Sequence, residues 1–226
     1  QTRARSMQIE DNEHYNFLYS YHVRNANMTR AAIVMYEKSL RLLYEGSSIE
    51  SLQQRHNSLL ACYNSLSMVN ADYQWLCKPI IEDKKVDEDM DEEMVDVDET
   101  VKVEVITLED VKKEILIVEA LLCLSKAKDL KLIMQMGANE LITVLATQKY
   151  FTNALKLAKG FKLSLAPIFE SLTLACLKSS KVEFNDNLEW LNQNNLGDLA
   201  LTISYSEMPW VYLRKLLAEE DVEKSY

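Results

Sequence analysis

An all-α fold, built as an irregular α-solenoid of antiparallel helix pairs, is predicted for this chain by three observations. Its 226 residues include only 4 Gly and 3 Pro, which leaves few of the tight turns that a many-stranded β fold needs. Apolar residues recur at helical spacing on both sides of a central acidic stretch. Alanines stand beside bulky residues in segments 28–36 and 150–158, where they favour close helix pairs. No strict repeat period appears, so an irregular stack is favoured over a compact bundle or a regular repeat family.

The first part of the chain, residues 1–78, predicts three helices. The first is expected over 15–25 and the second over 28–45, each with apolar residues three to four positions apart. Gly46 is expected to end the second helix, because glycine adopts a positive φ freely. Ser48 is suited to cap the third helix, since its hydroxyl can accept a hydrogen bond from a free amide of the first turn.

The last part, residues 107–226, predicts a longer series of helices. Thr107 and Asp110 have the spacing of a capping box, so a helix should begin there and continue through a strongly apolar stretch. Gly137 and Gly160 are expected to end two of the helices that follow. The expected helices are 107–124, 127–136, 139–146, 148–159, one capped by Ser164, and a last one that begins near Ser206.

Between these parts, residues 79–106 are expected to form an acidic, disordered insert. Eleven acidic residues and two lysines lie within 82–99, which accounts for most of the net charge of −10. Such a segment has too few apolar residues to form a core. An acidic bait for a basic partner is the alternative, whereas a Ca²⁺ loop is excluded because the Gly and spaced oxygen ligands are missing. Lys102 lies in a four-residue pattern typical of modifier attachment, which is too short to be specific.

The composition excludes several kinds of partner. Outside the insert the chain is close to neutral, so no basic patch is expected to bind nucleic acid. No apolar stretch is long enough for a membrane span, and no secretory signal is present. The cysteines show no CxxC pair and no histidine at ligand spacing, so they are expected to be reduced core thiols on helical faces: Cys62, Cys77, Cys123 and Cys176.

No catalytic, cofactor-binding or metal-binding residue is expected. The histidines are His14, His22 and His56, and none belongs to an HExxH motif or a Cys/His cluster. Gly137 and Gly160 stand alone, so no phosphate-binding loop is predicted. The chain is therefore not expected to be an enzyme or to bind a small-molecule substrate.

Aromatic residues are the remaining candidates for binding. Tyr15, Phe17, Tyr19 and Tyr21 could stack on bases, but no basic residues are interleaved, so a packed helix end is favoured. The tryptophans are expected to lie in the core, and any that is exposed becomes an interface candidate: Trp75, Trp190 and Trp210.

Several segments resemble, in order, the family of the one-hundred-and-sixty-kilodalton scaffold nucleoporin. The resemblance covers about 15–190, and its specificity comes from the number and order of the segments. They are 16–19, 30–32, 34–37, 61–66, 72–75, 106–110, 161–163 and 167–170.

This resemblance implies a fragment of a helical region that follows a β-propeller in the parent protein. It implies a structural role in the Y-shaped complex of the nuclear pore's outer rings, at the nuclear envelope, in support of pore assembly, mRNA export and protein transport. The implied partners are the eighty-five- and ninety-six-kilodalton nucleoporins at the hub of the Y, and the partner-contacting residues are not assigned. The acidic tract within 79–106 departs from the vertebrate members. The alternative function is a helical-repeat adaptor that recruits basic partners through this tract.

Overall fold

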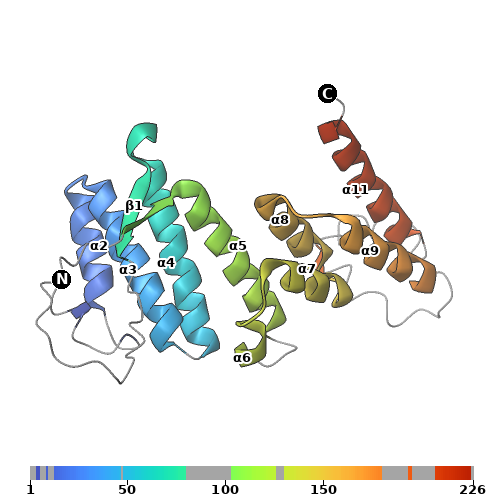
Figure 1. Cartoon of the computed structure of the whole chain (residues 1–226), viewed down its shortest axis with the longest axis horizontal. Coiled ribbons are helices and arrows are strands. Elements are labelled where there is room, and N and C mark those ends of the chain that lie inside the picture. The colour runs from blue at the N-terminus through green and yellow to red at the C-terminus, as the bar shows by residue number, and fades with distance from the viewer. Residues whose placement is uncertain are drawn as a thin grey trace, which may run out of the picture.

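The structure, a computed structural model, describes residues 4–5, 9, 13–46, 48–79, 103–125, 130–179, 193–194 and 207–224. Its helices lie in an open row, with the N-terminus at one end and the C-terminus at the other (Figure 1). They are α2 (His14–Arg24), α3 (Met28–Glu45), α4 (Ile49–Ser67), α5 (Leu108–Leu124), α6 (Leu130–Ile133), α7 (Ala138–Thr147), α8 (Phe151–Phe161), α9 (Ala166–Ser179) and α11 (Met208–Lys224). A 3-10 turn, Ala71–Tyr73, and two strands, β1 (Trp75–Pro79) and β2 (Val103–Thr107), complete the described elements.

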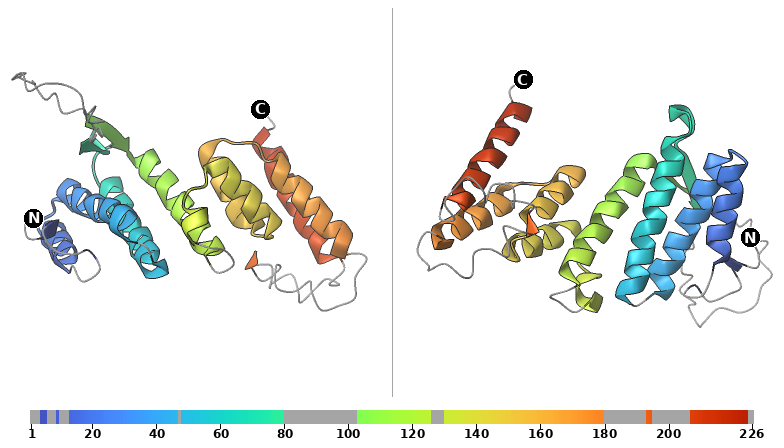
Figure 2. Two further views of the ribbon diagram at one scale, coloured as in Figure 1. Left: turned by 60° about the horizontal axis from the view of Figure 1, so that its bottom comes forward. Right: turned by 180° about the vertical axis from the view of Figure 1, so that it is seen from behind.

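The order of contacts confirms the predicted α-solenoid. Helix α3 packs between α2 and α4, and α4 packs against α5. Helix α5 then contacts α7 and α8, α7 contacts α9, and α9 contacts α11. Views from two further directions show the same extended row, with α5 between the two groups of helices (Figure 2).

The main hydrophobic core extends from α3 to α11, because α5 buries residues on both of its sides, while a second, smaller cluster that includes Tyr15 and Val34 packs α2 against α3. Val111, Val118 and Leu124 of α5 are fully buried. They belong to a single cluster that includes Leu59 of α4 and Leu157 of α8. The helical segments on the two sides of the insert therefore share a continuous core.

Local capping signals predicted two helix starts correctly. The Ser48 hydroxyl accepts a hydrogen bond from the Ser51 amide at 3.0 Å, and α4 begins at the next residue. The Thr107 hydroxyl accepts from the Asp110 amide at 3.3 Å, while the Asp110 carboxylate accepts from the Thr107 amide at 3.0 Å. The Thr107 hydroxyl also donates to the Asp110 carboxylate at 2.6 Å, and this bond, together with the one from the Thr107 amide, holds the pKa of Asp110 below its usual value.

The predicted helix end at Gly46 is confirmed, but its predicted cause is wrong, and Gly137 and Gly160 do not end helices as expected. Gly46 follows the end of α3, but its φ is −85°, and a Cβ there would lie 2.5 Å from the Leu42 carbonyl oxygen. Gly160 lies inside α8, which ends at Phe161, and the residue with a positive φ is Lys162. Gly137 begins α7 rather than ending a helix. Close approach, and not a positive φ, accounts for the glycine at 46.

The β strands were not predicted. Strands β1 and β2 form an antiparallel ladder in which Leu76 pairs with Ile106, and Pro79 pairs with Val103. The expected insert, 79–106, therefore overlaps the ladder at both ends. The positions between the strands, Lys102 among them, lie outside the described residues.

Candidate interaction surface

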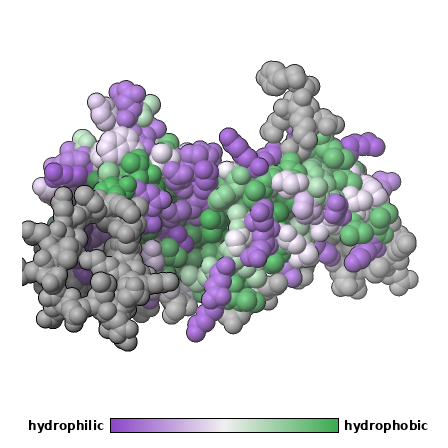
Figure 3. Space-filling view, in the orientation of Figure 1, coloured by the Kyte–Doolittle hydropathy of each residue, from purple (hydrophilic) through white to green (hydrophobic). Residues whose placement is uncertain are grey.

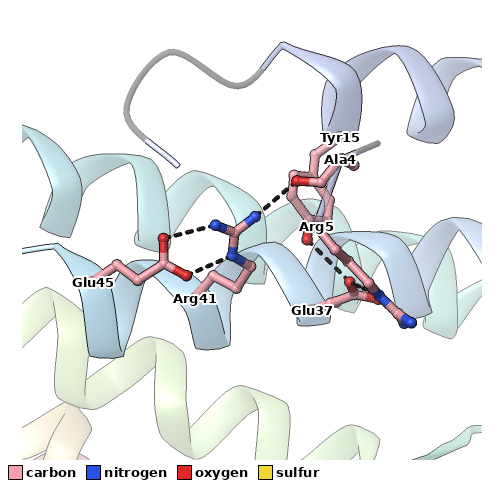
Figure 4. Close-up of polar contacts among 6 residues, drawn as sticks. All are labelled: Ala4, Arg5, Tyr15, Glu37, Arg41 and Glu45. Atoms are coloured by element: carbon pink, nitrogen blue, oxygen red, sulfur yellow. Dashed lines mark hydrogen bonds and ion pairs between the residues drawn. The ribbon is translucent and has the colours of Figure 1, made fainter. Parts of the chain in front are cut away.

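A polar cluster fixes the N-terminal end of the row on α3 (Figure 4). The Arg5 guanidinium donates to the two Glu37 carboxylate oxygens at 2.6 and 2.8 Å, and the Tyr15 hydroxyl donates to Glu37 at 3.0 Å. Arg41 donates to the Ala4 carbonyl oxygen at 2.8 Å and lies 5.9 Å from the centre of the Tyr15 ring. Burial is the main cause that raises the pKa of Tyr15. The charged side chains of this cluster therefore hold the N-terminal segment against α3.

A second polar cluster fixes α5, and with it the ladder, on α3 and α4. The Glu114 carboxylate accepts a hydrogen bond from the Tyr36 hydroxyl at 2.8 Å and one from the Arg55 guanidinium at 3.1 Å. Desolvation and the neighbouring Glu114 charge raise the pKa of Tyr36 far above its usual value, so Tyr36 stays a neutral donor. Strand β2 runs directly into α5, so this cluster also positions the ladder.

The two faces of the ladder differ in burial. Leu76 and Ile106 point inward and are 2% and 6% exposed. The opposite face carries Trp75, 45% exposed, and Val105, 56% exposed, because side chains alternate along a strand. We call the outward side the ladder surface, which consists of Tyr73, Trp75, Cys77, Val103 and Val105. Figure 3 shows apolar surface at this place, bounded by hydrophilic residues.

Trp75 separates two hollows of the ladder surface. The hollow toward α5 has a volume of about 450 Å³ and is lined by Ala71, Gln74, Trp75, Val105, Thr107, Leu108 and Glu109. The hollow toward α3 has a volume of about 400 Å³ and is lined by Thr29, Ile33, Val69, Tyr73, Trp75, Leu76 and Cys77. Large exposed apolar patches of this kind are typical of protein–protein contacts.

Exposed apolar residues also lie on the two helices at the C-terminal end of the row. Leu174 and Leu177 of α9 are 56% and 47% exposed, and Trp210 and Leu217 of α11 are 39% and 45% exposed. We call these four residues the terminal surface. Their spacing of three and seven positions places each pair on one side of its helix. Surfaces suited to apolar contact thus lie on both halves of the row.

Comparison with known families gives the identity of this helical row. Residues 1–68 match the family model described as NUP160/120 middle TPR, and residues 107–225 match the one described as Nup160 C-terminal TPR. The chain belongs to the Nup160 family. Strand β1 and the first four residues of β2 lie between the two matched regions, and the last residue of β2, Thr107, begins the second region.

The relatives of this Nup160-family chain are nuclear pore proteins. The fruit fly "Nuclear pore complex protein Nup160 homolog" is 37% identical over the whole chain, which spans 16% of that protein. The human "Nuclear pore complex protein Nup160" is 27% identical over the whole chain, which spans 17% of it. The thale cress protein NUP160 is 38% identical over 68 residues, which are 27% of this chain and 4% of that protein. The expectation of a nuclear pore protein at the nuclear envelope is confirmed at the level of the family.

The three histidines of the Nup160-family chain do not converge. His14 and His22 lie on α2, whereas His56 lies on α4 with its Nε2 atom 3.4 Å from a Glu119 carboxylate oxygen. Within the described ranges, no group of three or more His, Cys, Asp or Glu is placed to hold a metal ion. Across the same ranges, every helix is too short or too polar to cross a membrane.

The cysteines follow the prediction in part. None of the four forms a disulfide, and Cys62 and Cys176 are buried, which raises their pKa to about 12 and about 11. Cys123 is half-buried, and Cys77 is exposed on strand β1. The prediction of a helical core position is wrong for Cys77, because it points to the outer face of the ladder.

The aromatic residues also differ from one another in burial. Tyr15 is fully buried, as expected for a packed helix end, but Phe17 and Tyr21 are 72% and 56% exposed. The prediction of core tryptophans is wrong for Trp75 and Trp210, and both become interface candidates by the criterion set out above. Trp190 lies outside the described residues. No sequence signal separated the exposed from the buried aromatic residues, because the difference arises from packing between distant elements.

Proposed function

We propose that this chain is a structural segment of the nuclear pore scaffold and that it acts by protein–protein contact. The observation that carries the proposal is the open row of helices, most of which share one core, with exposed apolar residues on the ladder surface and the terminal surface. An open helical stack presents long flanks to neighbouring subunits. Exposed tryptophans on such flanks are typical of binding hot spots.

The proposed place of the parent protein is the Y-shaped complex of the outer rings. Family membership supports this place, and the implied neighbours are the eighty-five- and ninety-six-kilodalton nucleoporins. In that position the chain supports pore assembly and, through it, mRNA export and protein transport.

A non-enzymatic role is part of the proposal. The polar cluster of Tyr36 with Arg55 and Glu114 joins three helices and is used for packing. A catalytic group needs partners placed around a substrate-sized pocket. We therefore expect the chain to act through contacts at its surface.

Cross-linking of the intact parent protein in isolated nuclear envelopes tests the proposal. Lys78 lies in strand β1 and Lys215 lies on α11, so both should form links to other pore proteins. Lys156 of α8 is exposed, lines neither hollow of the ladder surface and is not part of the terminal surface, so it serves as the reference. The proposal fails if the described lysines form no link to any other subunit in intact pores.

The adaptor alternative predicts a different result. The high charge density of 82–99 supports it, because eleven acids there would attract a basic partner. Deletion of 82–99 should abolish partner pull-down if the chain is an adaptor of this kind. Under the scaffold proposal, the deletion leaves the contacts of the helical row in place.

A further inference from the structure

We propose that the ladder surface is the docking site for a segment of another protein that carries apolar side chains together with at least one Lys or Arg. This inference rests on the proposed scaffold function and adds the chemistry of one partner. The site consists of Trp75 and the two hollows beside it.

The shape of the surface favours an apolar partner. Trp75 stands between hollows of about 450 and about 400 Å³, and the walls of both are largely apolar. Trp75 is also held in place, because its Nε1–H donates to the Asp72 carbonyl oxygen at 3.3 Å. An aromatic side chain that is ordered before binding loses little conformational entropy on binding, which favours its use as a hot spot.

The charge of the surface favours a basic partner. Glu109 is the one Asp, Glu, Lys or Arg among the residues that line the two hollows. Asp72 lies three residues before Trp75, and both carboxylates are exposed. Neither forms an ion pair with any residue that the structure describes.

Two of the nearby lysines are paired with other carboxylates. The Lys78 ammonium lies 3.5 Å from a Glu104 carboxylate oxygen, and the Lys113 ammonium lies 3.5 Å from an Asp110 carboxylate oxygen. Lys112, three residues after Glu109 on α5, is exposed but lines neither hollow, so the charge within the lining itself is that of Glu109. A partner with Lys or Arg beside its apolar residues would gain charge pairs at the rim of the contact.

The same charges make other occupants less suitable. A second copy of this chain, related by two-fold symmetry, would bring Asp72 and Glu109 toward an identical acidic rim. Nucleic acid would bring its phosphates toward the same carboxylates. A basic, apolar segment of a different protein fits both the hollows and the charge.

Site-specific photo-cross-linking in cells tests this inference. A photoreactive phenylalanine analogue replaces Val105 in the full-length parent protein, and cross-linked peptides from isolated nuclear envelopes are identified by mass spectrometry. The expected link is to a segment of another pore protein that contains apolar residues and Lys or Arg. Glu109→Lys should lower the yield of this link about fivefold, because it replaces an attraction by a repulsion at the rim. Trp75→Ala should also lower the yield.

Glu50→Lys is the matched control. Glu50 is exposed in the first turn of α4, roughly 27 Å from the ladder end of this 19-residue helix. The control should leave the yield unchanged, although it makes the same change of charge. Circular dichroism of each variant checks that the helical fold is retained.

The inference is overturned if the photoreactive residue links only to a second copy, to this chain itself, or to a segment without Lys or Arg. It is also overturned if Glu109→Lys and Glu50→Lys have equal effects. Links from a photoreactive residue at Leu217, on the terminal surface, separate the two proposals. If these links persist while the ladder links fail, the scaffold function stands and the ladder inference falls.

Discussion

Arg55 of α4 and Glu114 of α5 form an ion pair of 3.1 Å in which the arginine side chain is only 8% exposed. Tyr36 of α3 donates to the other oxygen of the same carboxylate, so three consecutive helices of the row meet at Glu114. The Arg55 Nε atom is buried and has no hydrogen-bond partner among the described residues. The carboxylate is therefore the main compensation for a buried guanidinium charge.

Glu114→Gln should destabilise the fold by about 2 kcal/mol, because it leaves the buried Arg55 charge without its counterion. The value lies below that of a fully buried pair, since the Glu114 side chain is 26% exposed. Glu45→Gln is the control, because the Arg41–Glu45 pair lies on one helix with Glu45 41% exposed, and it should cost less than about 1 kcal/mol. Urea denaturation followed by circular dichroism measures both losses. Equal losses would show that the Arg55–Glu114 pair has no special role.

Gly46→Ala should lower the free energy of unfolding more than Gly160→Ala does. A Cβ at position 46 would meet the Leu42 carbonyl oxygen at 2.5 Å, and this backbone atom cannot move without bending α3. A Cβ at position 160 would meet the end of the Leu116 side chain, which can rotate away. We expect a loss of about 2 kcal/mol for Gly46→Ala and about half of that for Gly160→Ala, where a gain in helix propensity offsets part of the clash. The free energies of unfolding in urea check the order, and a reversed order would contradict this account.

The elements that could be predicted from the sequence are those whose signals are local. The Ser48 cap and the capping box of Thr107 and Asp110 depend on residues within one turn, so they could be identified directly. The ladder could not, because Leu76 and Ile106 pair across the whole acidic insert. Loop length and register are not visible in two five-residue segments.

The candidate surface was predictable only as a list of residue types. The tryptophans were singled out as interface candidates if exposed, but the exposure of Trp75 follows from the inward burial of its neighbour Leu76. That burial depends on helices that lie far away in the sequence. A pattern of alternating β-branched residues over 103–107 was the one local signal of the outer face.

Lys38→Met should remove a pH dependence of stability above neutral pH. Lys38 is 7% exposed, its ammonium donates to the Asn16 side-chain oxygen at 3.0 Å, and burial lowers its pKa. Between this lowered pKa and the unfolded value of about 10.4, the unfolded chain binds more protons, so this group makes stability rise with pH. Below the lowered pKa, both states are protonated and the contribution is constant.

Urea titrations at several pH values from 7 to 10 give the free energies of unfolding of the wild type and of Lys38→Met. The difference between the two values at each pH measures the effect. The wild type should gain stability relative to the variant as the pH rises. Lys156→Met removes an exposed lysine of α8 and should run parallel to the wild type. A constant difference between the wild type and Lys38→Met would show that the Lys38 ammonium is not desolvated.

The four thiols should differ in their rates of alkylation according to their burial. Cys77 is exposed on the ladder surface and should react first with N-ethylmaleimide in the native protein. Cys62 and Cys176 should be protected, because they are buried and their pKa values are raised to about 12 and about 11. Mass spectrometry of peptides after timed quenching gives the four rates, and urea should make them equal. Fast native modification of Cys62 would contradict the packing of α4.

Ile106 and Val105 test the assignment of the two faces of the ladder, because they are neighbours on one strand. Ile106 is 6% exposed and packs in the main core, so Ile106→Ala should cost about 2–4 kcal/mol. Val105 is 56% exposed, so Val105→Ala should cost less than about 1 kcal/mol, mainly through lower β propensity. Urea denaturation measures both values. Since a slip of one residue in the register would exchange the two faces, a larger loss for Val105→Ala would overturn both the register and the ladder surface.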